Sequence, residues 1–270
     1  MIADDPVKQY RAIWISDVHL GTRGCKAEYL LDFLRATESD RLYLVGDMID
    51  GWQLRKSWYW AQTHNDVIQK ILRKARKGTE VCYAPGNHDE MLRSFDELRL
   101  GNIHITDRFI HEMMDGRRLL VLHGDQFDSI VRYARWLAHL GDTAYNMTLA
   151  ANHYVNAARR RMGYPYWSLS AYLKHRVKNA VEYIDRFADA VAEAARKEGV
   201  DGVVCGHIHF AEIRDIGGVL YCNDGDWVES CTALVERLDG KLEIIQWLDY
   251  QALDPMVASP VPSPRQTVPA

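Results

Sequence analysis

The sequence predicts an α/β fold, because short apolar runs alternate with helical patterns and several runs end in polar, glycine-containing turns. The clearest helix covers residues 65–77, where apolar side chains recur at helical spacing and Gly78 provides a stop. The chain has 270 residues, 47% of them hydrophobic, which is enough for one main domain with a sizeable core. We therefore expect helices packed on a sheet, with ligand sites at the carboxyl ends of strands.

The same patterns place the remaining elements in chain order. The first half alternates strands with helices, and the second half returns to strands after a long helical segment. A second helix is expected at 28–35. Strands are expected at 10–16, 41–45, 80–83, 109–113, 119–122, 202–205, 211–216, 219–222, 232–238 and 242–247.

The segment between the two halves has a different character. Residues 129–180 hold eight Lys or Arg and one acid, a charge of +7; the whole chain carries −4, which leaves −11 elsewhere. We interpret residues 129–198 as a helical cap inserted within a domain that covers 1–250, and the Pro-rich residues 254–270 as a disordered tail. A solvated basic surface with packed aromatic side chains is the alternative interpretation of the cap.

Composition excludes several classes of protein. The sequence has no uninterrupted apolar run of about 18 residues and no basic, apolar leader, so we expect a cytoplasmic protein. Its five cysteines form no CxxC pair, which suits a reducing compartment and argues against a zinc knuckle. The net charge of −4 disfavours recruitment of nucleic acid by bulk electrostatics, and no stable nucleic-acid partner is expected.

Five short polar motifs follow predicted strands and carry the chemistry. Asp17 and His19 lie two residues apart, so a carboxylate and an imidazole on one face can share a divalent cation. Asp47 offers two oxygens and can bridge two cations, although a turn carboxylate that caps the next segment would look the same. His88 could donate a proton rather than bind metal. The motifs are Asp17-Val18-His19, Gly46-Asp47-Met48-Ile49-Asp50, Gly86-Asn87-His88-Asp89, His123-Gly124-Asp125 and Gly206-His207-Ile208-His209.

Taken in order, these motifs resemble those of the calcineurin-like metallophosphoesterases, over residues 13 to about 235. The resemblance implies a four-layer α/β fold, two packed β-sheets flanked by helices, with a two-metal site at the strand ends. It also implies two sets of metal ligands that share Asp47. One set is Asp17, His19, Asp47 and His209, and the other is Asp47, Asn87, His123 and His207.

The resemblance further implies a hydrolytic mechanism. His88 would be the catalytic proton donor or phosphate-contacting residue, and Asp50 would steer it. Two cations would activate a bridging hydroxide for attack on phosphorus. Mixed nitrogen and oxygen ligands without cysteine suit two divalent ions of Mn, Fe or Zn, and Mn is the expected metal because it is the commonest functional choice among similar enzymes.

A closer resemblance links residues 15–21 and 43–52, together with the helical insertion, to the UDP-2,3-diacylglucosamine diphosphatases of lipid A synthesis. It implies hydrolysis of UDP-2,3-diacylglucosamine to UMP and 2,3-diacylglucosamine 1-phosphate. It also implies a cap that receives acyl chains, with peripheral contact at the inner membrane. Enzymes of that branch typically carry Arg where this sequence has His88. A related enzyme acting on another nucleotide-linked or lipid pyrophosphate is therefore the main alternative.

Candidate substrate contacts in the cap follow from helix geometry. Lys174 and Lys178 share a helix face, and at most two of Arg159, Arg160 and Arg161 can face one phosphate, so Lys174, Lys178 and Arg160 are expected to bind an anionic substrate. The aromatic residues 52 and 58–60 would either line the rim or pack beneath the cap.

Two other function classes remain open. A phosphodiesterase or nuclease of the same superfamily is one of them. A metal-free protein-binding scaffold is disfavoured, because all seven ligand positions and His88 hold competent residues.

Overall fold

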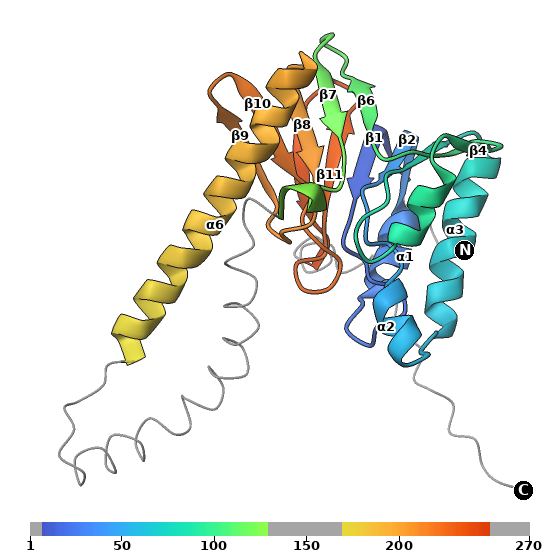
Figure 1. The fold of residues 1–270 in the computed structure, drawn as a ribbon. Coiled ribbons are helices and arrows are strands. Elements are labelled where there is room, and N and C mark those ends of the chain that lie inside the picture. Colours follow the sequence, from blue (N-terminus) through green and yellow to red (C-terminus); the bar gives the residue numbers. More distant parts are fainter. Residues whose placement is uncertain (1–6, 129–168, 249–270) are drawn as a thin grey trace, which may run out of the picture.

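The structure is a computed structural model that describes residues 7–128 and 169–248, with side chains described from residue 181 in the second range. Two mixed sheets pack face to face, and helices cover their outer faces (Figure 1). The first sheet has the order β12 (Leu242–Gln246), β11 (Thr232–Arg237), β1 (Lys8–Ile15), β2 (Thr37–Leu44), β3 (Glu80–Tyr83), β5 (Ile103–Ile105) and β4 (Leu98–Leu100). The second has the order β6 (Phe109–Glu112), β7 (Arg118–Val121), β8 (Gly202–Cys205), β10 (Val219–Asn223) and β9 (Glu212–Ile216).

The core has three parts, one between the sheets and one under each helical layer. Trp14 and Tyr43, which are register partners on the parallel strands β1 and β2, stack with ring centroids 5.3 Å apart and face the second sheet. Helices α1 (Ala27–Ala36) and α3 (Gln62–Arg76) pack on the other face of the first sheet. The described elements thus form the helix–sheet–sheet–helix layers of the expected α/β fold.

Helix α6 (Leu169–Glu198) covers the second sheet with only part of its length. Phe187, Val191 and Ala195 are buried against β8 and β10, while the N-terminal half of the helix extends away from both sheets (Figure 1). Residues 129–168 of the expected cap and residues 254–270 of the expected tail lie outside the described residues. The division of the chain into domain, cap and tail stays a prediction.

All the expected strands and both expected helices are present, with bounds shifted by at most four residues. The largest shift is in β2, which begins at Thr37 instead of 41, because α1 runs directly into the strand and Thr37 Oγ1 donates to the Phe33 carbonyl at 2.8 Å. Helix α2 (Gly51–Lys56) and strands β4 and β5 were not predicted. They are only six, three and three residues long, too short to show a period.

No helix in the described part of the chain combines the length and the apolar character needed to cross a bilayer.

One buried charge lies under the first sheet. Lys74 of α3 is only 1% exposed, and its ammonium donates to the carbonyl of Thr37 and lies 3.2 Å from Glu38 Oε2. Burial lowers the pKa of Lys74 to about 8, although Glu38 partly opposes this shift. The unfolded chain keeps the proton up to a pH of about 10.4, so between these two pKa values the unfolded state binds more protons.

This difference makes a stability prediction. The free energy of unfolding gains a Lys74 contribution as the pH rises from about 8 to about 10.4, on the order of 3 kcal/mol in total. We expect the difference in unfolding free energy between wild type and Lys74→Met to change by that amount between pH 7 and pH 10.5, in favour of wild type at the higher pH. Urea denaturation of both proteins across this range measures it, and parallel pH profiles would refute it.

Candidate metal centre

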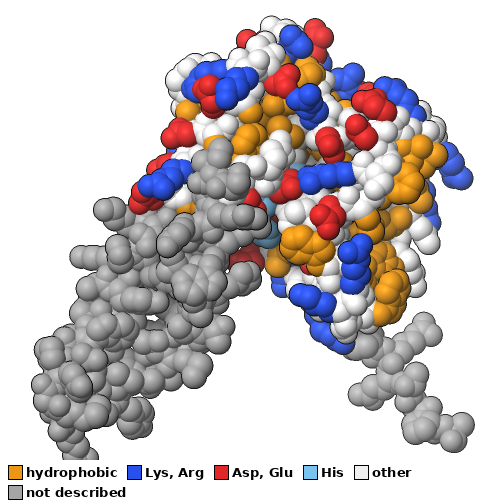
Figure 2. All heavy atoms as spheres, in the orientation of Figure 1, with side chains coloured by type: hydrophobic (Ala, Val, Ile, Leu, Met, Phe, Trp, Pro, Cys, Tyr) orange, Lys and Arg blue, Asp and Glu red, His pale blue; other side chains and the backbone are white. Residues whose placement is uncertain are grey.

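The five polar motifs meet at one edge of the two packed sheets. Strands β1, β2 and β3 are parallel neighbours, as are β7 and β8, so their carboxyl ends point to the same edge of each sheet. Each motif begins within four residues of the end of one of these strands. Figure 2 shows histidine side chains reaching the surface there, beside acidic and hydrophobic side chains.

The backbone at this edge is strained. Positive φ angles occur at seven non-glycine residues of the described part of the chain, and five of them belong to these motifs. Non-glycine residues in this conformation cost about 1–3 kcal/mol each, and such residues gather at functional sites. The five are Asp17 (49°), His19 (54°), Asp47 (52°), His207 (72°) and His209 (55°).

Asp47 lies at the centre of the cluster. Its Oδ2 is 3.4 Å from His123 Nε2, 3.8 Å from His19 Nε2 and 4.0 Å from His88 Nε2. Its Oδ1 accepts the backbone N–H of His88 at 2.8 Å, which fixes the carboxylate plane. One oxygen of Asp47 therefore faces imidazoles from three motifs.

Asp17 presents one oxygen to the cluster in a similar way. Its Oδ2 accepts the backbone N–H of His207 at 2.7 Å and lies 2.6 Å from Ser16 Oγ. Its Oδ1 is buried without a hydrogen bond and lies 3.0 Å from His209 Nε2 and 3.9 Å from His19 Nε2. This leaves Asp17 Oδ1 directed at two imidazoles.

Contacts on the far side of each ring set the orientation of the histidines. His123 Nδ1 donates to the Val45 carbonyl at 2.7 Å, so Nε2 faces Asp47. His19 Nδ1 is 3.3 Å from Asp50 Oδ2. His207 Nε2 is 2.7 Å from Asp128 Oδ1, and its Nδ1 is 3.2 Å from His123 Nε2. Such outer partners fix the tautomer and ring angle of metal-binding histidines.

Asp50 also reaches the fifth imidazole of the cluster. Its Oδ2 is 3.1 Å from His88 Nδ1, and its Oδ1 accepts the N–H of Gln53 at the start of α2. Burial opposes the charge of Asp50, but its contacts with His19 and His88 outweigh burial and lower its pKa. An ionised Asp50 at this position favours a proton on His88, since a carboxylate stabilises an adjacent imidazolium.

The electrostatics of the cluster favour cations. Burial works against charge at every position, yet the carboxylates raise the pKa of His123 to about 10 and that of His209 to about 9. The pKa of Asp47 is lowered, because His123 and His19 together outweigh its burial. The buried carboxylates carry negative charge that a bound cation would balance. Without a cation, protons on the neighbouring imidazoles balance that charge, which is what the raised histidine pKa values indicate.

Two further carboxyl groups position the loops, and neither role could be predicted from local sequence patterns. Asp89 is fully buried and accepts backbone N–H groups from Asp47, Met48 and Gly86, which ties two of the motif loops together. Asp224 Oδ1 lies 2.6 Å from Ser16 Oγ, behind Asp17. Burial raises the pKa of Asp224 well above its usual range, and Ser16 Oγ lies within hydrogen-bond distance of both Asp224 and Asp17.

The calcineurin-like phosphoesterase family model matches residues 10–211 of this chain. The chain belongs to that family. The match confirms the prediction of a metal-dependent phosphoesterase.

Several known proteins are similar to this phosphoesterase. The UDP-2,3-diacylglucosamine hydrolase of Xanthomonas oryzae pv. oryzae is 28% identical over 242 residues, covering 84% of this chain and 96% of the relative. The UDP-2,3-diacylglucosamine hydrolase of Pseudomonas paraeruginosa is 26% identical over 204 residues, covering 73% of this chain and 81% of the relative. Among solved structures, the Escherichia coli phosphoesterase YfcE aligns with 87% of this chain and 98% of its own, at 15% identity and a TM-score of 0.42. Vps29 of Entamoeba histolytica aligns with 87% of this chain and 96% of its own, at 14% identity and a TM-score of 0.41.

Members of the family typically bind two metal ions, and the donor atoms of this phosphoesterase fit such ions. Three overlapping groups each bring their ligand atoms within 4.8 Å of one another. Both side-chain polar atoms of Asn87 are buried without a hydrogen-bond partner in the described residues, which is costly unless a ligand binds them. The three groups are Asp17, His19 and His209; His19, Asp47 and His88; and Asp47, His123 and His207.

The structure does not bring all the predicted substrate contacts of the phosphoesterase together. Lys174 and Lys178 lie on the N-terminal half of α6, and Arg160 lies outside the described residues, so their roles stay predictions. Trp52 at the start of α2 packs against His88, with ring centroids 4.3 Å apart. This contact places one of the predicted rim aromatics beside the cluster.

The close approach of Ser16 and Asp17 to the backbone at Gly206 leads to a second prediction. A Cβ atom at Gly206 would lie 2.2 Å from Ser16 Oγ and 2.6 Å from Asp17 Oδ2, too close for either atom to stay in place. We expect Gly206→Ala to displace Asp17, lower the metal content and reduce turnover of the phosphoesterase by about tenfold or more, with a stability loss of about 1–3 kcal/mol.

The matched control is Gly24→Ala, because a Cβ atom there would meet only Val228 at an ordinary 3.7 Å. Metal analysis and turnover with a generic phosphodiester compare the two variants. Equal metal content and turnover in both would show that the close approach at Gly206 has no role.

Proposed function

We propose that this enzyme holds two divalent metal ions, Mn²⁺ by preference, at the edge of the sheets where the five motifs meet. The observation that carries the proposal is the position of Asp47, whose Oδ2 lies within 4.0 Å of a nitrogen of three imidazoles. Asp47 is then shared by both ions. Asp17, His19 and His209 complete one ligand set, and Asn87, His123 and His207 complete the other.

When bound, two such ions supply an activated water and neutralise charge on phosphoryl oxygens. The chain itself supplies position and a proton. His88 is 24% exposed at its side chain, so it can reach a substrate, and Asp50 holds its Nδ1 at 3.1 Å. His88 donates a proton to the leaving oxygen or a hydrogen bond to the phosphoryl group, and Asp50 favours the protonated ring.

We propose that the substrate is UDP-2,3-diacylglucosamine, cleaved to UMP and 2,3-diacylglucosamine 1-phosphate. The support is the name of the curated relatives, UDP-2,3-diacylglucosamine hydrolase, one of which matches along 96% of its length. The basic segment 129–180 suits an anionic substrate, and the proposal gives residues 129–198 the role of a cap over the acyl chains. Such a substrate would bring the enzyme into peripheral contact with the cytoplasmic face of the inner membrane.

The experiment is product analysis by phosphorus NMR. Mn-loaded protein is incubated with UDP-2,3-diacylglucosamine and, separately, with a generic phosphodiester. UMP together with a lipid monophosphate is the expected result. Cleavage of the generic diester alone would retain the phosphoesterase and discard the lipid substrate.

A phosphodiesterase acting on another nucleotide-linked or lipid phosphoester is the second candidate. It is favoured by His88 itself, because enzymes of the diacylglucosamine branch typically carry Arg at this position. A panel of nucleotide-linked pyrophosphates and phosphodiesters in the same NMR assay separates the two candidates.

A further inference from the structure

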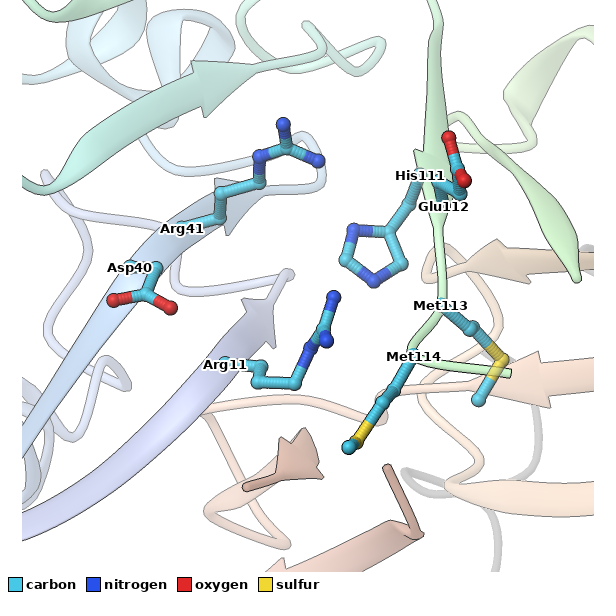
Figure 3. A pocket seen from close by; sticks show the side chains of 7 residues that line it. All are labelled: Arg11, Asp40, Arg41, His111, Glu112, Met113 and Met114. Atoms are coloured by element: carbon cyan, nitrogen blue, oxygen red, sulfur yellow. The ribbon is translucent and has the colours of Figure 1, made fainter. Parts of the chain in front are cut away.

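A cavity lies far from the metal centre, toward the opposite ends of the strands. It has a volume of about 470 Å³ and opens between the first sheet and strand β6 of the second. Figure 3 shows Arg11 from β1, Arg41 from β2 and His111 from β6 pointing toward a common space. The volume falls within the range of about 300–1,000 Å³ that is typical of small-molecule sites. The remaining lining residues are Asp40, Glu112, Met113 and Met114.

A β-bulge directs Arg11 into this cavity. Tyr10 pairs with Arg237 of β11 and Ala12 pairs with Glu236, so Arg11 is an extra residue with no partner in the ladder. Without the bulge, strict alternation would place Arg11 on the face opposite to Ala12, which packs between the sheets. Bulges of this kind re-aim side chains and are over-represented beside functional sites.

A buried polar network holds the floor of the cavity. Glu236 is fully buried, and its Oε2 accepts from His111 Nε2 at 2.9 Å and lies 3.3 Å from Arg11 Nε. His111 Nδ1 lies 3.1 Å from the hydroxyl of Tyr43. Burial lowers the pKa of His111 although Glu236 opposes the shift, so the ring is neutral, donating through Nε2 and accepting through Nδ1. Both ring nitrogens of His111 are therefore used within the network, which leaves Arg11 and Arg41 as the cationic groups of the lining.

The carboxylates beside the two arginines occupy one edge of each guanidinium. Glu236 lies at Nε of Arg11, and Glu80 Oε2 accepts from Nε of Arg41 at 2.9 Å. Within the described residues, Arg11 makes no other ion pair or hydrogen bond. The terminal nitrogens of Arg11 are thus held in place by a buried partner and remain available to an anion, which a guanidinium binds in a forked arrangement.

We propose that this cavity binds the phosphate group of a small phosphate monoester, with Arg11 and Arg41 as the anion contacts. The apolar wall of Met113 and Met114 receives the organic part of the ligand, since methionine adapts to irregular shapes. The carboxylates of Asp40 and Glu112 at the exposed mouth repel additional phosphates, so the site selects a monoester over a polyphosphate. The cavity is a binding site separate from the metal centre and independent of the proposed substrate.

Calorimetric titration of the Mn-loaded protein with AMP, glucose 6-phosphate and inorganic pyrophosphate tests the proposal. We expect a monoester to bind with a Kd below about 1 mM, more tightly than pyrophosphate, and Arg11→Gln to weaken that binding at least about tenfold. Arg41→Gln should weaken it as well, and because Arg41 does not touch Glu236 this second variant keeps the test valid where Arg11→Gln unfolds. Arg118→Gln, an exposed arginine on β7, is the matched control and should bind normally.

The metal centre is a competing phosphate site, and a separate variant distinguishes it. Asp47→Asn, which removes a proposed metal ligand, should leave monoester binding at the cavity unchanged. Binding that is lost in Asp47→Asn but kept in both arginine variants would place the ligand at the metals and overturn the proposal. The absence of any binding at about 10 mM monoester would overturn it too.

Discussion

Asp47→Ala is expected to abolish hydrolysis, by roughly 1,000-fold or more, and to deplete both bound metal ions. Among the residues that the structure describes, Asp47 Oδ2 is the one carboxylate oxygen that faces imidazoles from three motifs, so no described neighbour can replace it. Its loss also removes the acceptor of the His88 backbone N–H at 2.8 Å, which loosens the third motif loop. Turnover of a phosphodiester and metal content by mass spectrometry are the two measurements.

Asp47 has φ of 52°, and alanine tolerates this conformation less well than aspartate. Asp47→Asn is therefore the companion variant, since asparagine adopts the same backbone and keeps an oxygen for the His88 N–H. Both variants should lose metal and activity, whereas Asp189→Asn, at an exposed position on α6, should lose neither. Wild-type turnover in Asp47→Asn would overturn the assignment of the metal centre.

His88→Ala is expected to slow turnover about 100-fold or more while leaving the metal content nearly intact, a loss of about 2.7 kcal/mol of transition-state stabilisation. The side chain of His88 contacts Asp50 and Trp52, and its backbone N–H, which the substitution preserves, holds Asp47. The geometry also permits another role, because His88 lies with His19 and Asp47 in a group that could hold a metal. Metal analysis separates the two roles. Loss of metal in proportion to loss of activity would make His88 a ligand.

His88→Arg adds a test of substrate. Arginine is typical of the diacylglucosamine branch at this position, so this variant should keep metal and shift the ratio of activity on UDP-2,3-diacylglucosamine to activity on a generic diester upward. A ratio that stays unchanged would show that this position does not determine the substrate. His104→Ala serves as the control, since His104 lies away from the cluster on β5.

The elements that carry the candidate site could be predicted from the sequence because each motif directly follows an apolar strand. Strands 80–83 and 202–205 were placed without error, and they lead into Asn87 and His207. Hydrophobic periodicity and composition identify a strand from a few consecutive residues, and each motif is likewise a short continuous segment. The α/β class followed from the alternation of strands and helices, whereas the four-layer order was implied by the resemblance to the family.

Long-range contacts explain what could not be predicted. Asp89 looks like a turn residue in the sequence, and only the approach of the Asp47 loop reveals it as an acceptor for two loops. Asp224 lies 208 positions from Ser16, and nothing local marks their contact. The bulge at Arg11 was hidden as well, because one extra residue in a strand changes register without changing composition.

Five of the proposed metal ligands have a left-handed backbone conformation that lowers the stability of this enzyme, yet their side chains are needed for its activity. Glycine at those positions would relieve strain of about 1–3 kcal/mol each and would remove the side chains that bind metal. A library screened for thermal resistance alone would accumulate such replacements and drift toward robust, inactive proteins. Engineering of this phosphoesterase should therefore hold Asp17, His19, Asp47, His207 and His209 fixed and seek stability elsewhere, for instance at the buried ammonium of Lys74.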